Sequence, residues 1–180
     1  MGESVTLDRL AELSEEDRQA LRALSTAVYP PEDFKDWPGR RIEWSDAEWG
    51  VRIHGSDGAL VSYVGISVRD GLHDGGPVRI GGIGGVKTHP AFRGRGLAAR
   101  GMQRADEFFR GYPGVEFALL VCQAPLLEYY GGLGWRPFTG RLLVRQHGGP
   151  AEFTFNRVMT RAVRSPAPET GTIDVLGPPW

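Results

Sequence analysis

The sequence predicts one α/β domain of the mixed (α+β) kind, spanning residues 1–180. The first observation is the length, since 180 residues with 41% hydrophobic side chains suit a single domain with a buried core. The second is that the apolar period changes repeatedly between that of a helix and that of a strand. The third is the direct succession of a strand, a glycine-rich turn and a helix within residues 78–109.

One helix and one irregular segment are predicted before residue 50. Ser14 is a suitable helix N-cap, because acidic residues follow it in the first turn. Apolar residues recur at helical spacing as far as Val28, and Pro30-Pro31 ends the helix. Residues 32–49 have no regular period, and acidic and aromatic side chains are interleaved there.

Strands are predicted next, because the apolar period becomes two after Trp49. They lie around Val51–Ile53, from Leu60 to Val68 and from Val78 to Thr88, with a turn at 54–58 and a loop at 70–77 between them. Residues 81–85, in the centre of the last of these strands, are nearly bare of side chains. Such glycines indicate a β-bulge or the close approach of a ligand, and both interpretations stay open.

The second half of the chain predicts a helix, a buried strand and several short elements. The helix follows the turn at 89–96 and ends at Gly111, and the buried strand covers Val115–Cys122. The remaining expected segments are a short helix at 124–130, strands at 135–138, 141–145 and 153–159, and a linker at 165–168. Because the chain is apolar again after that linker, we expect residues 165–180 to form an extension docked on the domain.

Composition argues against several classes of protein. A formal net charge of −1 does not suit a nucleic-acid binder that depends on a global positive field. No apolar run approaches the ~20 residues of a membrane span, and the first residues do not resemble a signal peptide. One cysteine, Cys122, excludes an internal disulfide and a thiolate zinc cluster. We therefore expect a cytoplasmic protein with no metal, no nucleic-acid partner and no membrane association.

The turn at Arg93-Gly94-Arg95-Gly96 carries the clearest chemical signal. The first N–H groups of a helix have no internal partner and suit a pyrophosphate, and glycines let the backbone approach it closely. A tight turn before a helix is the plain alternative. A dinucleotide fingerprint would need its first glycine directly after the strand, but His89 to Arg93 intervene, and no acidic residue ends the next strand.

Two blocks of sequence resemble the GNAT acetyltransferases. Arg93-x-x-Gly96-x-Ala98, following a strand and His89-Pro90, is similar to the coenzyme A pyrophosphate motif of that family. The block 127–135, with Tyr130 before glycines and Trp135, is similar to its late helix, turn and strand. The resemblance covers residues 50–160 and implies a GNAT fold, with a central, mostly antiparallel mixed sheet flanked by helices. It also implies that strands ending near Thr88 and Cys122 splay beside the cofactor.

The order of features over most of the chain is also similar to that of the aminoglycoside 2'-N-acetyltransferases, including the kasugamycin-modifying branch. The features are the first helix, the acidic and aromatic segment, the core and an end at Trp180. This resemblance implies direct acetylation of an aminoglycoside amine by acetyl-CoA, in a homodimer.

The GNAT resemblance assigns roles to residues of this chain. It implies that acetyl-CoA is held by two runs of residues, which are Val86, Lys87 and Thr88, and Arg93, Gly94, Arg95, Gly96, Leu97 and Ala98. Tyr130 would be the general acid, with Tyr129 as the neighbouring candidate and an ordinary core aromatic as the alternative.

The acceptor side is expected to be acidic and aromatic, because carboxylates pair with ammonium groups and tryptophans stack on sugar rings. Its candidate residues are Glu32, Asp33, Asp36, Glu152 and Trp180. The general base cannot be carried over, since the glutamate of the 2'-acetyltransferases corresponds to Gly84 here. The candidates for it are Glu152, the Trp180 carboxylate, Asp174, an acid within 32–49 acting through water, and His89.

Other functions stay open at this point. The chain could be a GNAT enzyme that acetylates another small amine or a peptide. It could also be a non-catalytic acyl-CoA-binding sensor, because Gly84 stands where a base is expected.

Overall fold

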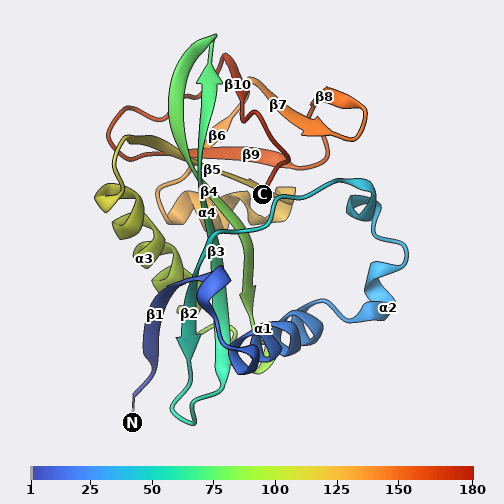
Figure 1. Cartoon of the computed structure of the whole chain (residues 1–180), viewed down its shortest axis with the longest axis vertical. Coiled ribbons are helices and arrows are strands. Elements are labelled where there is room, and N and C mark those ends of the chain that lie inside the picture. The colour runs from blue at the N-terminus through green and yellow to red at the C-terminus, as the bar shows by residue number, and fades with distance from the viewer. Residues whose placement is uncertain (1) are drawn as a thin grey trace.

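The computed structural model describes residues 2–180, and its spine is an antiparallel hairpin of two long strands (Figure 1). These strands are β3 (Leu60–His73) and β4 (Gly76–Thr88). Within the described residues they belong to a ten-stranded sheet in the order β6-β9-β5-β4-β3-β10-β7-β8, with β2 on β3 and β1 on β2. All neighbours are antiparallel except β4 with β5 and β10 with β7. The predicted mixed, mostly antiparallel sheet is confirmed.

The remaining elements are short apart from two helices. The strands are β1 (Ser4–Arg9), β2 (Trp49–His54), β5 (Val115–Cys122), β6 (Arg136–Phe138), β7 (Arg141–Gln146), β8 (Gly149–Glu152), β9 (Arg157–Ala162) and β10 (Thr172–Asp174). The helices are α1 (Glu15–Val28), α2 (Pro31–Phe34), α3 (Leu97–Gly111) and α4 (Leu127–Gly132). None of them is long and apolar enough to cross a membrane within the described part of the chain.

The hairpin is longer than the sequence predicts. Pairing continues from Asp70 and Arg79 to His73 and Gly76, through the segment expected to be a loop. The turn needs only two residues, because Asp74 and Gly75 have φ values of 48° and 80°. Such a turn with two left-handed residues matches the twist of a hairpin. The polar residues in segment 70–77 are present because the tip of the hairpin is exposed to solvent. They do not mark the point where the strands end.

Strand positions also differ near both ends of the chain. β1, β8 and β10 are not predicted, and the last long strand covers Arg157–Ala162 instead of residues 153–159. The apolar residues Phe153 and Phe155 misled the prediction. They are apolar because they pack edge-on against Trp44, at ring-centroid distances of 5.9 and 6.4 Å, outside any strand.

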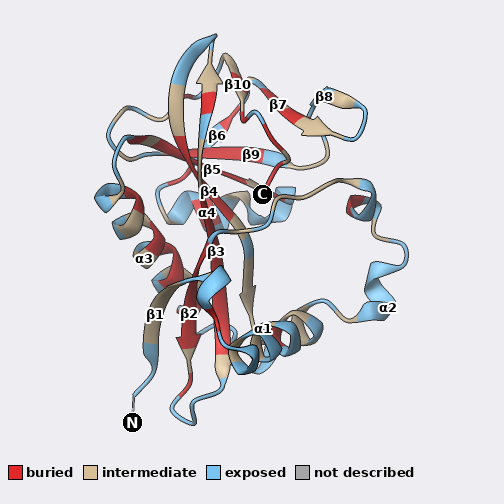
Figure 2. Ribbon diagram, in the orientation of Figure 1, coloured by how far each residue is buried: buried red, intermediate tan, exposed pale blue. Residues whose placement is uncertain are grey.

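The two faces of the sheet bury different clusters, and the buried residues are concentrated along the central strands and α3 (Figure 2). Side chains alternate between faces along a strand, so Val64 and Leu120 lie on one face and Leu119 on the other. We call the first the α3 face, because Met102, Ala105 and Phe109 of α3 cover it. We call the second the Trp180 face, and its cluster includes Ile80, Phe117, Leu119, Ile173, Val175 and Trp180.

Helix α1 begins as its sequence predicts. The Ser14 hydroxyl accepts a hydrogen bond from the Asp17 N–H at 3.1 Å, and three acidic residues occupy the first turn. The helix lies near the end of β4, where Lys87 Nζ donates to Ser25 Oγ at 2.9 Å. These contacts place the end of α1 beside the end of β4.

Candidate active site

A gap opens between β4 and β5 where their pairing stops. The last paired residues are Ile83 and Leu120, although β4 continues to Thr88. A β-bulge lies at the start of the gap, because β3 pairs Gly65 with Gly84 and then Tyr63 with Lys87. The bulge bends β4 away from β5 and leaves its main chain free to pair with another extended molecule. The splay expected near Thr88 and Cys122 is therefore present.

Val86, Lys87 and Thr88, the run of β4 predicted to hold the cofactor, point their side chains into the protein. Lys87 reaches Ser25, and Thr88 Oγ1 lies 2.9 Å from Ser62 Oγ. Val86 packs against the buried cluster of the α3 face. Any contact of residues 86–88 with a ligand in the gap would therefore come mainly from their main-chain groups.

The glycine turn, residues 93–96, joins the gap to the start of α3. Gly94 and Gly96 have φ values of 75° and 72°, which a residue with a side chain rarely adopts. A Cβ atom on either would meet no atom within 4 Å, so the turn is open to solvent. The first helical hydrogen bond runs from the Arg100 N–H to the Gly96 oxygen at 3.0 Å. The N–H groups before it are available for an anion.

Two guanidinium groups flank this turn. Arg93 and Arg95 are exposed, and neither forms an ion pair within residues 2–180. Arg93 Nε lies 3.4 Å from the Thr88 oxygen, and the Arg95 guanidinium lies 4.9 Å from the Phe92 ring centroid. The free helix N–H groups and two unneutralised cations can together bind a phosphate group.

Tyr130 and Tyr129 have different surroundings on α4. Tyr130 is 6% exposed and lies in the cluster with Cys122 and Trp135, whereas Tyr129 is 41% exposed. Burial raises the pKa of Tyr130, and the neighbouring Cys122 thiol and Tyr129 raise it further. Its hydroxyl has no hydrogen-bond partner in residues 2–180, yet it is not among the fully buried atoms that lack one. It is therefore a neutral donor that a ligand can still reach.

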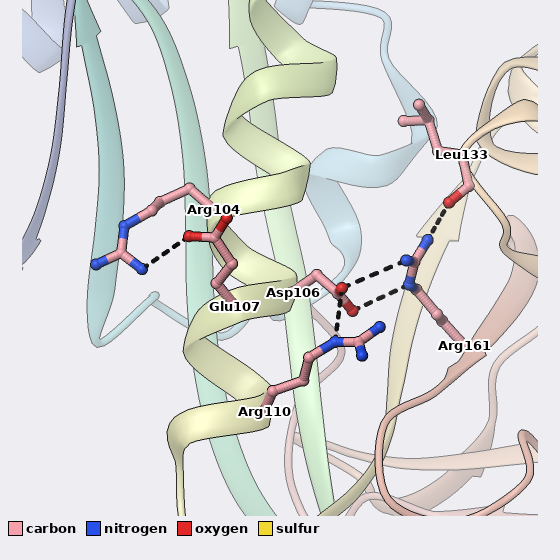
Figure 3. A network of polar contacts seen from close by, with 6 residues as sticks. All are labelled: Arg104, Asp106, Glu107, Arg110, Leu133 and Arg161. Atoms are coloured by element: carbon pink, nitrogen blue, oxygen red, sulfur yellow. Dashed lines mark hydrogen bonds and ion pairs between the residues drawn. The ribbon is translucent and has the colours of Figure 1, made fainter.

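A polar network holds α4 in place (Figure 3). Arg161 on β9 donates to the Leu133 oxygen directly after α4, and its Nε donates to Asp106 of α3 at 3.1 Å. Asp106 also accepts from Arg110 at 2.9 Å. Because one guanidinium binds both α3 and the end of α4, it fixes the helix that carries Tyr130 relative to the sheet.

Aromatic side chains form a wall on the Trp180 face. We define the aromatic wall as Trp37, Trp44, Phe153 and Phe155. The two tryptophans stack at 6.1 Å with an interplanar angle of 15°, and Phe155 meets Trp37 edge-on at 6.0 Å. A hollow lined by Gln123, Ala124 and residues 154–157 connects this wall to the end of β5.

The three predicted acids of this segment are exposed. Glu32, Asp33 and Asp36 lie on or directly after α2, at the periphery of the molecule (Figure 1). Within residues 2–180 their carboxylates accept no hydrogen bond and form no ion pair. They are available to a cationic ligand, but the structure does not bring them into contact with the β4–β5 gap.

Trp180 occupies a notch in the sheet that glycine creates. A Cβ atom on Gly82 would lie 1.1 Å from Trp180 Nε1, so only glycine leaves room for the indole. The Arg69 guanidinium stacks on the ring at 4.7 Å and donates to the Pro178 oxygen and Ser45 Oγ, both at 2.7 Å. Arg69 thus joins residues 175–180 to the segment before β2. A Cβ atom on Gly84 would lie 3.0 Å from the Trp180 main-chain carbonyl carbon.

Three candidates for the general base have structural partners. Glu152 pairs with Arg141 at 3.0 Å on the β7–β8 hairpin. Asp174 accepts two hydrogen bonds from Arg145 at 2.9 Å and one from the Leu176 N–H at 2.9 Å. His89 Nδ1 accepts from the Ala91 N–H at 3.3 Å. Within residues 2–180, no group of three or more His, Cys, Asp or Glu side chains is placed to hold a metal ion.

The Arg145–Asp174 pair should contribute to stability in a pH-dependent way. Burial would raise the pKa of Asp174, but hydrogen bonds from Arg145 and the Leu176 N–H lower it overall. A lowered folded-state pKa stabilises the protein above the unfolded value of about 3.9 and is lost as pH falls through the folded value. We expect Asp174→Asn to reduce the free energy of unfolding at pH 7 by about 2–3 kcal/mol. Denaturant titrations at pH 7 and pH 3 should show the deficit shrinking in acid.

A matched control is the Asp70–Arg79 pair, which is also two-pronged, at 2.7 and 3.2 Å, but exposed. Asp70→Asn should have a much smaller effect, because exposed ion pairs contribute little. Equal losses for the two variants would contradict the structural role of Asp174.

Tyr63 is a residue of this region that the sequence analysis did not single out. It is 6% exposed on β3, and its ring lies beside the bulge of β4, with Lys87 Nζ 5.5 Å from the ring centroid. A signal was present in the sequence, since Gly50, Gly65 and Gly85 stand on three strands that turn out to be neighbours. Their spatial meeting requires the strand register, which the sequence alone does not supply.

The structure combines three features. The parallel strands β4 and β5 splay apart, a glycine turn precedes α3, and the buried Tyr130 lies across the gap. Together these features define an acyltransferase fold. A family model described as the acetyltransferase (GNAT) family matches residues 9–135. The chain belongs to this family, which confirms the predicted enzyme class and the broader of the two predicted resemblances. A search of curated proteins finds no match.

Solved structures are similar in fold. An acyl-CoA N-acyltransferase from Pseudomonas aeruginosa is 24% identical, with a TM-score of 0.60 over 89% of this chain and 100% of that chain. A GNAT N-acetyltransferase from Escherichia coli in complex with CoA is 13% identical, with a TM-score of 0.63 over 97% and 90%. A GNAT acetyltransferase from Brucella melitensis in complex with acetyl-CoA is 14% identical, with a TM-score of 0.58 over 94% of both chains.

Proposed function

We propose that this chain transfers the acetyl group of acetyl-CoA directly to an amine of an aminoglycoside-type substrate, at a 2'-amino position, with kasugamycin among the candidate acceptors. One observation carries this proposal. The β4–β5 gap has a cationic glycine turn at one end, and a hollow on the Trp180 face joins the end of β5 to the aromatic wall. The chain segment that supplies Trp37 and Trp44 to this wall also carries exposed acidic residues.

The cofactor end matches the chemistry of coenzyme A. Its pyrophosphate would accept hydrogen bonds from the N–H groups of Gly94 to Ala98 and pair with Arg93 and Arg95. The amides of its pantetheine arm would pair with the main chain of Val86 to Thr88, which β5 leaves free. The E. coli and B. melitensis relatives, which contain CoA and acetyl-CoA, support this placement.

The glycine turn gives a direct test of the cofactor end. Gly96→Ala should raise the Kd for acetyl-CoA about tenfold, because an alanine at positive φ costs ~1–2 kcal/mol and shifts the N–H groups. Titration calorimetry measures the change. Gly75→Ala is the matched control, since Gly75 has φ 80° and open space around it but lies at the hairpin tip. Equal weakening in both variants would show that backbone strain, and not the contact of the glycine turn with the pyrophosphate, is responsible.

The chemical step needs a donor and an acceptor of protons. The amine nitrogen attacks the thioester carbonyl carbon, a C–N bond forms and the C–S bond breaks. The thiolate then takes the proton of the Tyr130 hydroxyl, whose raised pKa keeps it protonated beforehand. The attacking amine loses a proton to a base on the acceptor side.

The acceptor end favours a cationic ring system. The aromatic wall offers faces for stacking against the apolar faces of sugar rings, and cation–π attraction adds to this for ammonium groups. Glu32, Asp33 and Asp36 have no cation of their own in the described residues. We further propose that Trp180, held by Arg69, forms part of the same acceptor wall. We place Glu152 at its rim, where its charge reaches an acceptor only if its ion pair with Arg141 opens.

The test is CoA release from acetyl-CoA with a panel of acceptors. The panel holds aminoglycosides, kasugamycin, spermidine and short peptides. Turnover restricted to one or a few aminoglycosides supports the proposal, and a loss of turnover in Trp37→Ala and Trp44→Ala would assign the aromatic wall to acceptor binding. Turnover only with spermidine or a peptide would replace the acceptor class. CoA binding without turnover on any amine would favour a sensor.

A further inference from the structure

Position 84 is a glycine on the acceptor side of the gap, and a Cβ atom there would lie 3.0 Å from the Trp180 main-chain carbonyl carbon. The structure also places the Tyr63 hydroxyl and the segment that carries Asp46 beside this position. A Cβ atom on Gly65 would lie 2.7 Å from the Gly84 oxygen, 3.0 Å from Ala47 Cβ and 3.1 Å from the Tyr63 hydroxyl. The bulge of β4, the segment before β2 and the tip of Tyr63 therefore meet at one point.

Glycines on β2 and β3 make room for Tyr63, and Gly85 of β4 lies in ordinary contact with its ring. A Cβ atom would lie 2.6 Å from Tyr63 Cε2 if placed on Gly50, and 3.7 Å from Cε1 if placed on Gly85. The ring thus lies flat across β2, β3 and β4 and directs its hydroxyl along β3 to Gly65. Because a side chain at Gly50 or Gly65 would collide with the tyrosine, the sheet is shaped around this one residue.

The Tyr63 hydroxyl has no hydrogen-bond partner within residues 2–180, but it is not completely buried. It is not among the fully buried polar atoms that lack a partner. Burial raises the pKa of Tyr63 to about 12, with a further contribution from the negative charge of Asp46. The hydroxyl is therefore neutral at physiological pH and can accept one proton while giving up another.

The segment that carries Asp46 is fixed over β3. The Glu48 N–H donates to the Ile66 oxygen at 2.9 Å, and the Ser45 N–H donates to the Pro179 oxygen at 2.7 Å. Asp46 itself is exposed, and no side chain in residues 2–180 donates to its carboxylate. The charged groups around the pair are Lys87, which faces the Tyr63 ring, Arg69, which binds Ser45, and the exposed Glu48.

We propose that Tyr63 and Asp46 form the proton-accepting relay of the acetyl transfer, in place of a carboxylate at position 84. The inference rests on the proposed function. The substrate ammonium gives a proton to the Tyr63 oxygen, and the Tyr63 hydroxyl proton passes through solvent water to the exposed Asp46 carboxylate. The neutral amine then attacks the thioester, and exposed Asp46 returns its proton to solvent. Tyr63 is thus a catalytic residue, and Asp46 acts through it.

The test compares Tyr63→Phe and Asp46→Asn with the best acceptor found in the panel. Each should lower kcat about 10²-fold at pH 7, within the range of general-base catalysis. The double variant should be no slower than the slower single variant, because the two groups act in one chain. The deficits should shrink above the pKa of the acceptor amine, where no proton needs to be removed. Asp46→Glu should restore part of the rate.

Glu48→Gln is the matched control, since it removes a charge two residues away on the same exposed segment. It should keep kcat within about threefold. The relay would be overturned by any of three results. The losses of kcat in the single variants could multiply in the double variant, Glu48→Gln could lose as much kcat as Asp46→Asn, or the loss of kcat could persist at high pH. Unchanged acetyl-CoA binding in each variant establishes that the fold is intact.

A second measurement needs no acceptor. With ¹³C-labelled tyrosine, the Tyr63 signal, assigned with Tyr63→Phe, should show a pH-dependent step in the wild type that is absent from Asp46→Asn. Absence of this coupling overturns the relay even if an acceptor is found. Coupling without turnover on any amine instead overturns the proposed function, and the relay with it. Turnover on spermidine or a peptide changes only the acceptor class, and the relay is then tested with that acceptor.

Discussion

Tyr130→Phe should lower kcat about 10²- to 10³-fold, with the KM for acetyl-CoA changed by less than about threefold. The hydroxyl is the only atom removed, and it has no hydrogen-bond partner to lose in residues 2–180. The ring, which is 6% exposed, keeps its packing against Cys122 and Trp135. The loss therefore measures proton donation to the leaving thiolate, for which general-acid catalysis typically provides 10²–10⁴-fold.

The pH dependence gives a second, independent signature. Because burial raises the pKa of Tyr130 above the usual value of about 10, the acid form persists to higher pH than in an exposed tyrosine. Wild-type kcat should therefore show no alkaline decline below pH 10 from this group. A decline centred near pH 8 would assign the donor to another residue.

Tyr129→Phe is the control for Tyr130→Phe. Its ring lies 5.1 Å from that of Tyr130, but it is 41% exposed and does not belong to the buried cluster with Cys122. We expect kcat within about twofold of wild type. If Tyr129→Phe loses activity and Tyr130→Phe does not, the general acid is one residue earlier than proposed. Steady-state kinetics with the best acceptor of the panel decide between these outcomes.

The central part of the fold was predictable because its signals are local. Ser14 caps α1, and the glycine turn precedes α3, as the sequence indicates. The hairpin tip and β9 were not predictable. A pattern of apolar residues does not show whether a segment pairs as a β-strand or only packs its side chains against others. Phe153 and Phe155 are apolar because they pack against Trp44, outside any strand. Asp70 is exposed, yet it still pairs within β3.

The candidate site was predictable only where one stretch of chain forms it. The runs 86–88 and 93–98 and the α4 residue Tyr130 are each contained in a short motif. Asp174 was a reasonable candidate base from its position in the sequence, but its partner Arg145 lies on β7, the parallel neighbour of β10. Tyr63 depends on glycines that become neighbours only through the register of β2, β3 and β4.

Gly82→Ala should be the most destabilising of the single-methyl substitutions considered. The added Cβ would lie 1.1 Å from Trp180 Nε1 and 1.6 Å from Cε2, so the indole must leave its notch. Trp180 is 7% exposed, and loss of a buried tryptophan costs about 3–5 kcal/mol in comparable cores. The Trp180 Nε1 donor has no partner in this notch, which offsets part of the loss. We therefore expect the free energy of unfolding to fall by about 2–4 kcal/mol.

Expulsion of the indole should also release what it holds together. Arg69 stacks on Trp180 while it binds Pro178 and Ser45, so the segment carrying Asp46 should loosen with it. Gly82→Ala should thus shift tryptophan fluorescence to longer wavelength, make residues 175–180 more susceptible to proteolysis and lower kcat/KM for the acceptor more than acetyl-CoA affinity. In a Trp180→Ala background, Gly82→Ala should cost less than about 1 kcal/mol, because the methyl group then enters vacated space. A Gly82→Ala effect of the same size with and without Trp180 would show that the strand itself, and not the notch, requires glycine.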